Sequence, residues 1–258
     1  MTETQRIVAV IPARYSSQRL PAKPLIDLLG KPMVQRVYEQ ATRASLVGKV
    51  VVATDDERIA SVVRDFGGEA ILTPSSIRSG SDRVAAVALK TEGDIFVNVQ
   101  GDEPLIPPAM IDEAVRTLLE DDRAVAGTLA KNIVSHEELL NPAVVKVVMD
   151  VNGYALYFSR SAVPFFRDEP QQTLWPTRMT YYKHIGIYVF RRSFLAAFAR
   201  MPESTLEAAE KLEQLRILEN GYSIKVGITE HDSIPIDTQE DVERVRRLLG
   251  VATTKGTS

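Results

Sequence analysis

The sequence predicts an α/β fold with a Rossmann-like, mostly parallel sheet and a smaller subregion embedded in its second half. In the first half, short apolar runs alternate with helical patterns, which is typical of parallel strands joined by crossover helices. Polar loops follow the first and fourth of these runs, at the position where open α/β sheets bind ligands. Beyond residue 123 the alternation loosens, which indicates additional structure inserted into the domain.

The first half contains four strand-like runs, and helical patterns follow them. The helices are expected to begin at a proline, at an acidic first turn or at a Ser-Gly turn. The strands are IVAVI (7–11), KVVVAT (49–54), EAILT (69–73) and DIFVNVQ (94–100), and the helices span 33–45, 56–66, 81–89 and about 107–120.

The second half is less regular. Strands are expected in AVAGTLA, VVKVVM, ALYFS, HIGIYVF and SIKVGI, and helices over 206–220 and 239–249. A segment with three prolines, 164–180, is expected to be a loop that caps the site or meets a partner subunit. We therefore expect a single domain over 1–250, with a subregion at about 124–190 and a disordered tail over 251–258.

Composition excludes several classes of protein. The 258 residues carry a net charge of −3, whereas general nucleic-acid or membrane-surface binders carry a basic excess. There is no cysteine, so disulfides and thiolate metal sites are excluded. No apolar run approaches the ~20 residues of a membrane span, and the N-terminal MTETQR lacks an apolar signal segment. We expect a cytoplasmic protein that binds neither nucleic acid nor membrane.

Familiar catalytic motifs are missing from the sequence. No G-x-G-x-x-G follows a strand, and no Walker A pattern occurs, which argues against nicotinamide dehydrogenases and P-loop NTPases. The three histidines are too scattered to predict a zinc site, and no G-x-S-x-G elbow is present.

The loop after the first strand, within VIPARYSSQRLPAKPL (10–25), predicts an anion site. It places Arg14, Arg19 and Lys23 together, and a triphosphate needs several such donors from one side. Ser16 and Ser17 add hydroxyl and backbone donors. The alternative is a solvated basic loop.

Two aspartates are candidate metal ligands. In NVQGDEPLI (98–106) an apolar strand ends in Gln100, Gly101 and Asp102, where the glycine allows backbone to approach a ligand closely. Mg²⁺ typically takes one or two carboxylates and completes its shell with phosphates and water. Asp102 could instead shape a turn or cap a helix. Asp237, in SIPIDTQED, follows an apolar run and from its sequence alone is a helix cap.

The turn SGSDR (79–83) precedes a predicted helix. Exposed backbone groups at Ser79 and Gly80 could read the edge of a base. A capped helix start explains the same residues equally well.

These segments resemble the 3-deoxy-manno-octulosonate cytidylyltransferases (CMP-Kdo synthetases). The match begins at the loop PAR…S…RLP.KPL, continues in order through SGSDR, QGDEP, YFSR, KHIGIY and KLEQLR, and covers Val8 to about Leu248. The resemblance implies a fold of the sugar nucleotidyltransferase type and the reaction of CTP with Kdo to give CMP-Kdo and pyrophosphate for lipopolysaccharide biosynthesis. It also implies a homodimer, with sugar binding and dimerisation in the subregion at about 124–190.

The resemblance also implies residue roles. Magnesium is held by Asp102 and Asp237, with Asp241 left structural, and Arg14 and Lys23 join the two aspartates as catalytic residues. The nucleotide is bound by Pro12, Ala13, Arg14, Ser16, Arg19, Lys23, Ser79, Gly80 and Gln100. The chain departs from the family at Ser76-Ile77-Arg78, where D-H-Q is common, and at Ser81, where threonine is usual.

The remaining matches concern the sugar acid, which presents a carboxylate and several hydroxyls. Arg160 suits the carboxylate, and hydroxyls suit His184, Tyr188, Glu213 and Gln214. Each also has a structural explanation: a surface ion pair, core strand residues or a solvated helix face. Two further functions remain open, namely activation of a related acid (8-amino-Kdo or a sialic acid) and a non-catalytic nucleotide-binding regulator.

Overall fold

The computed structural model describes residues 5–16, 20–77 and 79–255, and the chain divides into two compact units. Unit 1 comprises Met1–Asp112 and Asp232–Ser258, and unit 2 comprises Glu113–His231. Unit 2 is therefore inserted between two segments of unit 1. Among the described residues, no helix is long and apolar enough to cross a membrane.

Unit 1 contains four parallel strands in the order β3-β2-β1-β4. They are β1 (Ile7–Ala13), β2 (Lys49–Thr54), β3 (Ala70–Leu72) and β4 (Ile95–Asn98). β1 and β4 are buried along almost their whole length, as expected for parallel strands covered on both faces by helices. All four strands were predicted, and the carboxyl ends of β1 and β4 lie side by side.

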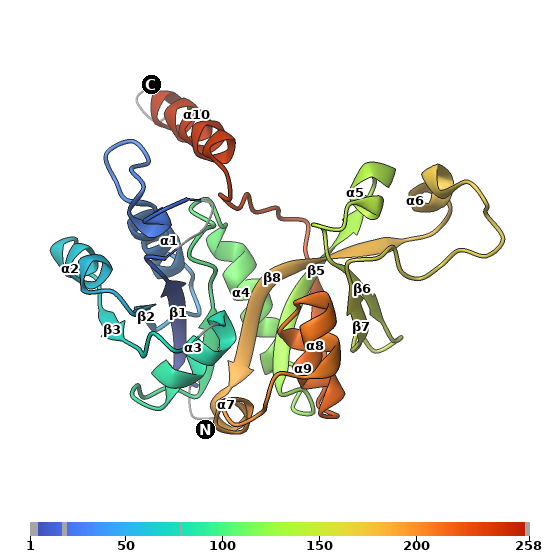
Figure 1. Cartoon of the computed structure of the whole chain (residues 1–258), viewed down its shortest axis with the longest axis horizontal. Coiled ribbons are helices and arrows are strands. Elements are labelled where there is room, and N and C mark those ends of the chain that lie inside the picture. Colours follow the sequence, from blue (N-terminus) through green and yellow to red (C-terminus); the bar gives the residue numbers. More distant parts are fainter. Residues whose placement is uncertain (1–4, 17–19, 78, 256–258) are drawn as a thin grey trace. The chain divides into compact units, whose positions relative to one another are not determined.

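Helices α1, α2 and α3 lie close to these strands in Figure 1, and α4 begins in unit 1 and continues into unit 2. They are α1 (Met33–Thr42), α2 (Glu57–Asp65), α3 (Gly80–Ala88) and α4 (Pro108–Leu119), each within a few residues of its prediction. Asp56 caps α2 by accepting the Arg58 N–H, and Ser79 caps α3 by accepting the Asp82 N–H. Lys23–Leu25 form a short 3₁₀ helix, η1.

The last helix, α10 (Gln239–Lys255), also belongs to unit 1. Val242 and Val245 pack with Leu28 and Met33 in one buried cluster, which brings the C-terminal segment to the loop after β1. The helix runs past its predicted end at residue 249 and into the tail expected to be disordered, whose residues 256–258 lie outside the described ones.

Unit 2 is built around β5 (Ala126–Ile133), which pairs antiparallel with β8 (Tyr181–Arg191) and parallel with β9 (Ile224–Ile228). β6 (Lys146–Met149) pairs antiparallel with β7 (Ala155–Ser159) and with β8. The register of β5 on β8 shifts between Thr128 and Leu129, where the Thr128 hydroxyl bonds the Ile185 and Ile187 carbonyls.

The helices of unit 2 are short, and they correct one prediction. The expected single helix over 206–220 is wrong: α8 (Thr205–Glu210) and α9 (Gln214–Glu219) are separate, because Lys211 adopts a left-handed φ of 53° and ends α8. The helical spacing of apolar residues continues through Lys211, so the sequence pattern does not indicate the break. The other helices are α5 (His136–Leu140), α7 (Arg192–Phe198) and, inside the predicted loop 164–180, η2 (Gln172–Leu174) and α6 (Trp175–Arg178).

Candidate active site

A pocket of about 220 Å³ lies at the carboxyl ends of β1 and β4 in unit 1. Its lining includes the predicted nucleotide-binding residues of the loop after β1, together with the QGD segment that follows β4. Arg19 lies outside the described residues. The lining residues are Pro12, Ala13, Arg14, Ser16, Lys23, Pro24, Met33, Gln100, Gly101 and Asp102.

Gly101 is required by the contact between these two loops. A Cβ atom at Gly101 would lie 2.5 Å from the Pro12 carbonyl oxygen, closer than any side chain tolerates. The close approach predicted for this glycine therefore involves the neighbouring backbone. It allows Asp102 to sit beside the loop after β1.

Lys23 joins the two predicted metal ligands. Its Nζ lies 2.7 Å from Asp102 Oδ2 and 3.0 Å from Asp237 Oδ1. The residue before it, Ala22, has a left-handed φ of 53°, and its N–H donates to the Tyr15 carbonyl at 3.2 Å. This tight turn directs the lysine toward both carboxylates.

Asp237 is not the cap of α10. Thr238 and Asp241 bond reciprocally at the start of that helix: the Thr238 hydroxyl accepts the Asp241 N–H at 3.2 Å, and Asp241 Oδ2 accepts the Thr238 N–H at 2.8 Å. The Asp237 side chain bonds Lys23 instead. The Ile236 N–H donates to the Asp102 carbonyl at 2.9 Å, so the two aspartate-bearing segments are joined through their backbones.

This donor set suits a divalent cation. One oxygen of each aspartate lies within 3.0 Å of a single point that already holds a positive charge. No group of three or more His, Cys, Asp or Glu side chains with metal-site geometry occurs in the described part of the chain. Two carboxylates and an open pocket are nevertheless what Mg²⁺ uses when phosphates and water complete its shell.

The second basic side chain of the pocket, Arg14, is anchored away from the aspartates. Its Nη2 donates to the Ile77 carbonyl at 2.7 Å, and its Nε lies 4.0 Å from Asp55 Oδ2. Arg83 bonds the same two residues and is fully buried. Burial lowers the pKa of Arg83. The charge of Asp55 acts in the opposite direction and raises this pKa, whereas the charge of Arg14 lowers it further. Sequence reasoning missed this structural arginine.

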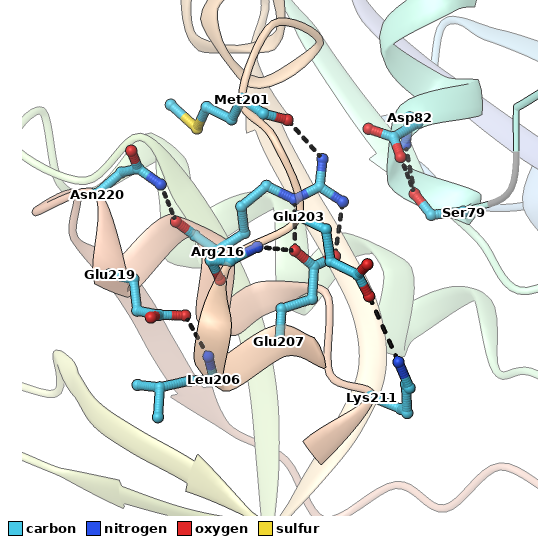
Figure 2. Close-up of polar contacts among 11 residues, drawn as sticks. Ser79, Asp82, Met201, Glu203, Leu206, Glu207, Lys211, Arg216, Glu219 and Asn220 are labelled. Carbon is cyan, nitrogen blue, oxygen red and sulfur yellow. Dashed lines mark hydrogen bonds and ion pairs between the residues drawn. The ribbon is translucent and has the colours of Figure 1, made fainter. Parts of the chain in front are cut away.

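The SGSDR turn begins a capped helix. The Ser79 hydroxyl donates to Asp82 Oδ2 at 2.7 Å and accepts the Asp82 N–H at 3.0 Å (Figure 2). Ser79 and Gly80 are not among the residues that line the pocket. The capping explanation is confirmed, and contact with a base remains a prediction.

Glu103, next to Asp102, is buried. Burial, together with the charge of Asp102, raises the pKa of Glu103 to about 7. One of its oxygens, Oε2, has no hydrogen-bond partner among the described residues. Nothing in the sequence distinguished this glutamate from a turn residue.

In unit 2, three of the predicted sugar-binding residues lie close together. His184 Nε2 is 2.9 Å from the Thr128 hydroxyl, and its ring packs against Phe158 and Tyr188. Burial lowers the pKa of His184 to about 3, so the ring is neutral at pH 7. Burial and the nearby charge of Glu213 raise the pKa of Tyr188 well above its usual value.

Gln214, at the start of α9, is 3% exposed, and its Nε2 has no hydrogen-bond partner among the described residues. A buried amide donor of this kind indicates a position that a ligand oxygen could occupy. An ion pair stabilises this segment: Arg216 donates to Glu207 Oε1 at 2.6 Å and Oε2 at 2.8 Å (Figure 2).

Arg160 is the fifth predicted sugar-binding residue. Its Nε donates to the Glu210 carbonyl at 2.7 Å and its Nη1 to the Pro142 carbonyl at 3.1 Å. The Arg160 carbonyl accepts from Lys146, a fully buried lysine that also bonds the Asn141 and Val144 carbonyls. Sequence reasoning missed Lys146 because it lies within an apolar run, and it missed Glu210 because it resembles an ordinary polar residue on a helix face.

Comparisons with known proteins identify the family. The cytidylyltransferase family model matches residues 8–226. The 3-deoxy-manno-octulosonate cytidylyltransferase of Geotalea uraniireducens is 54% identical over 95% of this chain and 99% of its own length, and that of Geobacter sulfurreducens is 55% identical over 94% and 99%.

Solved structures agree with the fold. A structure of CMP:2-keto-3-deoxy-manno-octonic acid synthetase complexed with CTP superimposes with a TM-score of 0.89 and 42% identity, over 96% of this chain and 99% of that one. A 4-diphosphocytidyl-2C-methyl-D-erythritol synthase from Anaerococcus prevotii, 15% identical with a TM-score of 0.62 over 96% and 100% of the two chains, shares the fold. The predicted α/β fold is confirmed, and this chain belongs to the 3-deoxy-manno-octulosonate cytidylyltransferase family.

Proposed function

We propose that this chain is a 3-deoxy-manno-octulosonate cytidylyltransferase, which joins CTP and Kdo into CMP-Kdo and pyrophosphate. One observation carries the assignment to this site: Lys23 and Asp102 line the pocket after β1, and Lys23 also pairs with Asp237. The relatives that carry this name match nearly the full length of the chain.

In this proposal, unit 1 binds the nucleotide. Arg14, Ser16 and Lys23 contact the triphosphate, with Arg19 from the same loop, and Lys23 offsets the charge that develops on the leaving pyrophosphate. Asp102 and Asp237 hold Mg²⁺, which when bound polarises the α-phosphate and lowers the pKa of the attacking hydroxyl. Pro12, Ala13 and Gln100 line the pocket for the rest of the nucleotide, and Ser79 and Gly80 contact the base.

Unit 2 supplies the groups for the sugar acid. Arg160 binds the carboxylate, while His184, Tyr188, Glu213 and Gln214 contact hydroxyls. The neutral ring of His184 supports this role, as does the buried Nε2 of Gln214, which has no hydrogen-bond partner among the described residues. The C2 hydroxyl attacks the α-phosphorus in line, and no covalent enzyme intermediate is required.

We also propose that the protein acts in the cytoplasm, where CTP is available, and forms a homodimer through unit 2. Val134 and Phe165 are 77% and 72% exposed, and the Phe165 ring contacts Trp175 of the buried cluster that also contains Tyr181. Contact with a second copy of the chain would remove this apolar surface from water. Light scattering of the purified chain tests this, and a monomeric mass contradicts it.

The test of function is pyrophosphate release from CTP and Mg²⁺, with and without Kdo. Release that depends on Kdo and is lost in Asp102→Asn supports the proposal. Release that depends instead on 8-amino-Kdo or a sialic acid assigns a different acceptor. Binding of CTP without release, whatever acid is added, indicates a non-catalytic nucleotide-binding protein.

A further inference from the structure

Lys23 stands where the proposed metal site needs a cation. Its ammonium lies within 3.0 Å of one oxygen of Asp102 and one of Asp237, and its side chain is 14% exposed, compared with 32% and 40% for the aspartates. A metal held by these two aspartates would compete with the ammonium for these oxygens. An ammonium and a divalent ion cannot hold the same lone pairs at once, because the metal bonds oxygen at about 2.0–2.1 Å.

The two aspartates do not depend on Lys23 to stay near each other. The Ile236 N–H bonds the Asp102 carbonyl at 2.9 Å, and the Asp237 N–H bonds Asp241 Oδ2 at 3.0 Å. Removal of the lysine therefore leaves two carboxylates held close together by the backbone and takes one positive charge from beside them.

Lys23 itself can exchange partners. Its backbone is fixed in η1 by the left-handed turn at Ala22, whereas its ammonium is a point charge on a flexible stem. The same side chain lines the pocket with Arg14 and Ser16, where the triphosphate is expected. Phosphate oxygens offer the ammonium an alternative acceptor as soon as the nucleotide arrives.

We propose that Lys23 is a resident cation that pairs with Asp102 and Asp237 in the free enzyme and moves to the triphosphate when nucleotide and metal bind together. This inference rests on the proposed function, and it adds an order of events to it. Without nucleotide, Lys23 competes with the metal and weakens its binding. With nucleotide, the lysine transfers to the phosphates and the metal site becomes available.

The test measures metal affinity without CTP, by calorimetry or by the electron paramagnetic resonance signal of free Mn²⁺. Lys23→Met removes the competitor and makes the site more negative by one charge, so Mn²⁺ should bind roughly 10-fold or more tightly than to wild type. Lys23→Arg keeps the charge, so its affinity should stay within about threefold of wild type. Unchanged or weaker binding to Lys23→Met overturns the proposal.

Two controls define the site. Lys31→Met removes a lysine that pairs with Glu39 at 2.6 Å elsewhere in unit 1, and it should leave Mn²⁺ affinity unchanged. The double variant Lys23→Met/Asp102→Asn should lose the increase in Mn²⁺ affinity that Lys23→Met alone produces. If the double variant keeps this increase, the metal binds elsewhere and the proposal fails. If Lys23→Met does not fold, as judged by circular dichroism, Lys23→Gln provides the same measurement. Failure of Kdo-dependent pyrophosphate release in wild type contradicts the proposed function but does not alter this comparison.

Discussion

In unit 1, Lys23 lines a pocket and bonds two carboxylates, Asp102 and Asp237, that remain 32% and 40% exposed. In unit 2, Arg216 and Glu207 bond each other, and their side chains are only 6% and 7% exposed. Charge in contact with solvent can change partners at little cost, whereas a buried pair is stable only when both members are present. The first arrangement suits phosphate and metal exchange. The second stabilises the segment that carries Glu213 and Gln214.

The polar groups near the proposed acceptor residues extend this contrast. His184 is neutral and partly buried, and among the described residues Lys146 donates only to backbone carbonyls. Such groups are fixed in place before any ligand arrives. Unit 2 is therefore preorganised, whereas the ionic contacts of the unit 1 pocket can rearrange.

The strongest test of this difference is Arg216→Met. The Glu207 carboxylate would remain buried without its partner, and the free energy of unfolding should fall by about 3–5 kcal/mol. Urea unfolding monitored by circular dichroism measures it. Glu203→Gln is the matched control, because Glu203 and Lys211 form an exposed pair at 3.5 Å and the loss should stay below about 1 kcal/mol. Equal losses of unfolding free energy in the two variants would show that the buried pair does not differ from the exposed pair.

In unit 1 the corresponding changes should affect rate and leave stability nearly intact. Asp102→Asn and Asp237→Asn should each lower kcat roughly 100-fold at saturating CTP and Kdo, because each removes one ligand of the proposed metal. The melting temperature should change little, since both side chains are partly exposed. A near-normal rate for Asp237→Asn would show that its pairing with Lys23 has no catalytic role.

Arg160 tests whether the preorganised unit binds the acid. Arg160→Lys loses the two-pronged fork and should raise the KM for Kdo by about 10-fold, while the KM for CTP stays constant. Arg160→Ala should raise the KM for Kdo further, and Arg123→Ala, which changes a 73% exposed arginine of unit 2, should not raise it. Steady-state kinetics with each substrate varied measures both constants. Equal shifts in the two KM values would indicate a structural arginine.

The smallest effect is a pH dependence of stability. The pKa of His184 is about 3 in the folded protein and ~6.5 in the unfolded chain. As the pH falls below 6.5, the unfolded chain therefore binds a proton at His184, whereas the folded protein does not. Its contribution to stability is complete above pH 6.5 and is lost toward pH 3. Between pH 7.5 and 5.5 wild type should lose about 1 kcal/mol more than His184→Gln in urea unfolding. His136→Gln should retain the wild-type dependence, and a parallel loss in His184→Gln would contradict the assignment.

Much of the unit 1 fold and of its site follows from local sequence. The apolar runs determine β1, β2 and β4, because a strand buried on both faces needs little beyond its own composition. The residues of the loop after β1 are adjacent in sequence, so their common pocket could be predicted. In unit 2 the same reasoning failed at Lys211, because a left-handed residue inside a continuous apolar pattern gives no signal in the pattern itself.

The sequence by itself determined the fold class, the family and the loop that lines the pocket, since these depend on local periodicity and on motifs whose residues are near neighbours. Only the tertiary structure decided that Lys23 pairs with Asp237, 214 positions away, and that Thr238 rather than Asp237 caps α10. It also decided that Arg83 and Lys146 are buried. The physical reason is that a side chain's charge state and partners depend on the elements packed around it, and those come from distant parts of the chain.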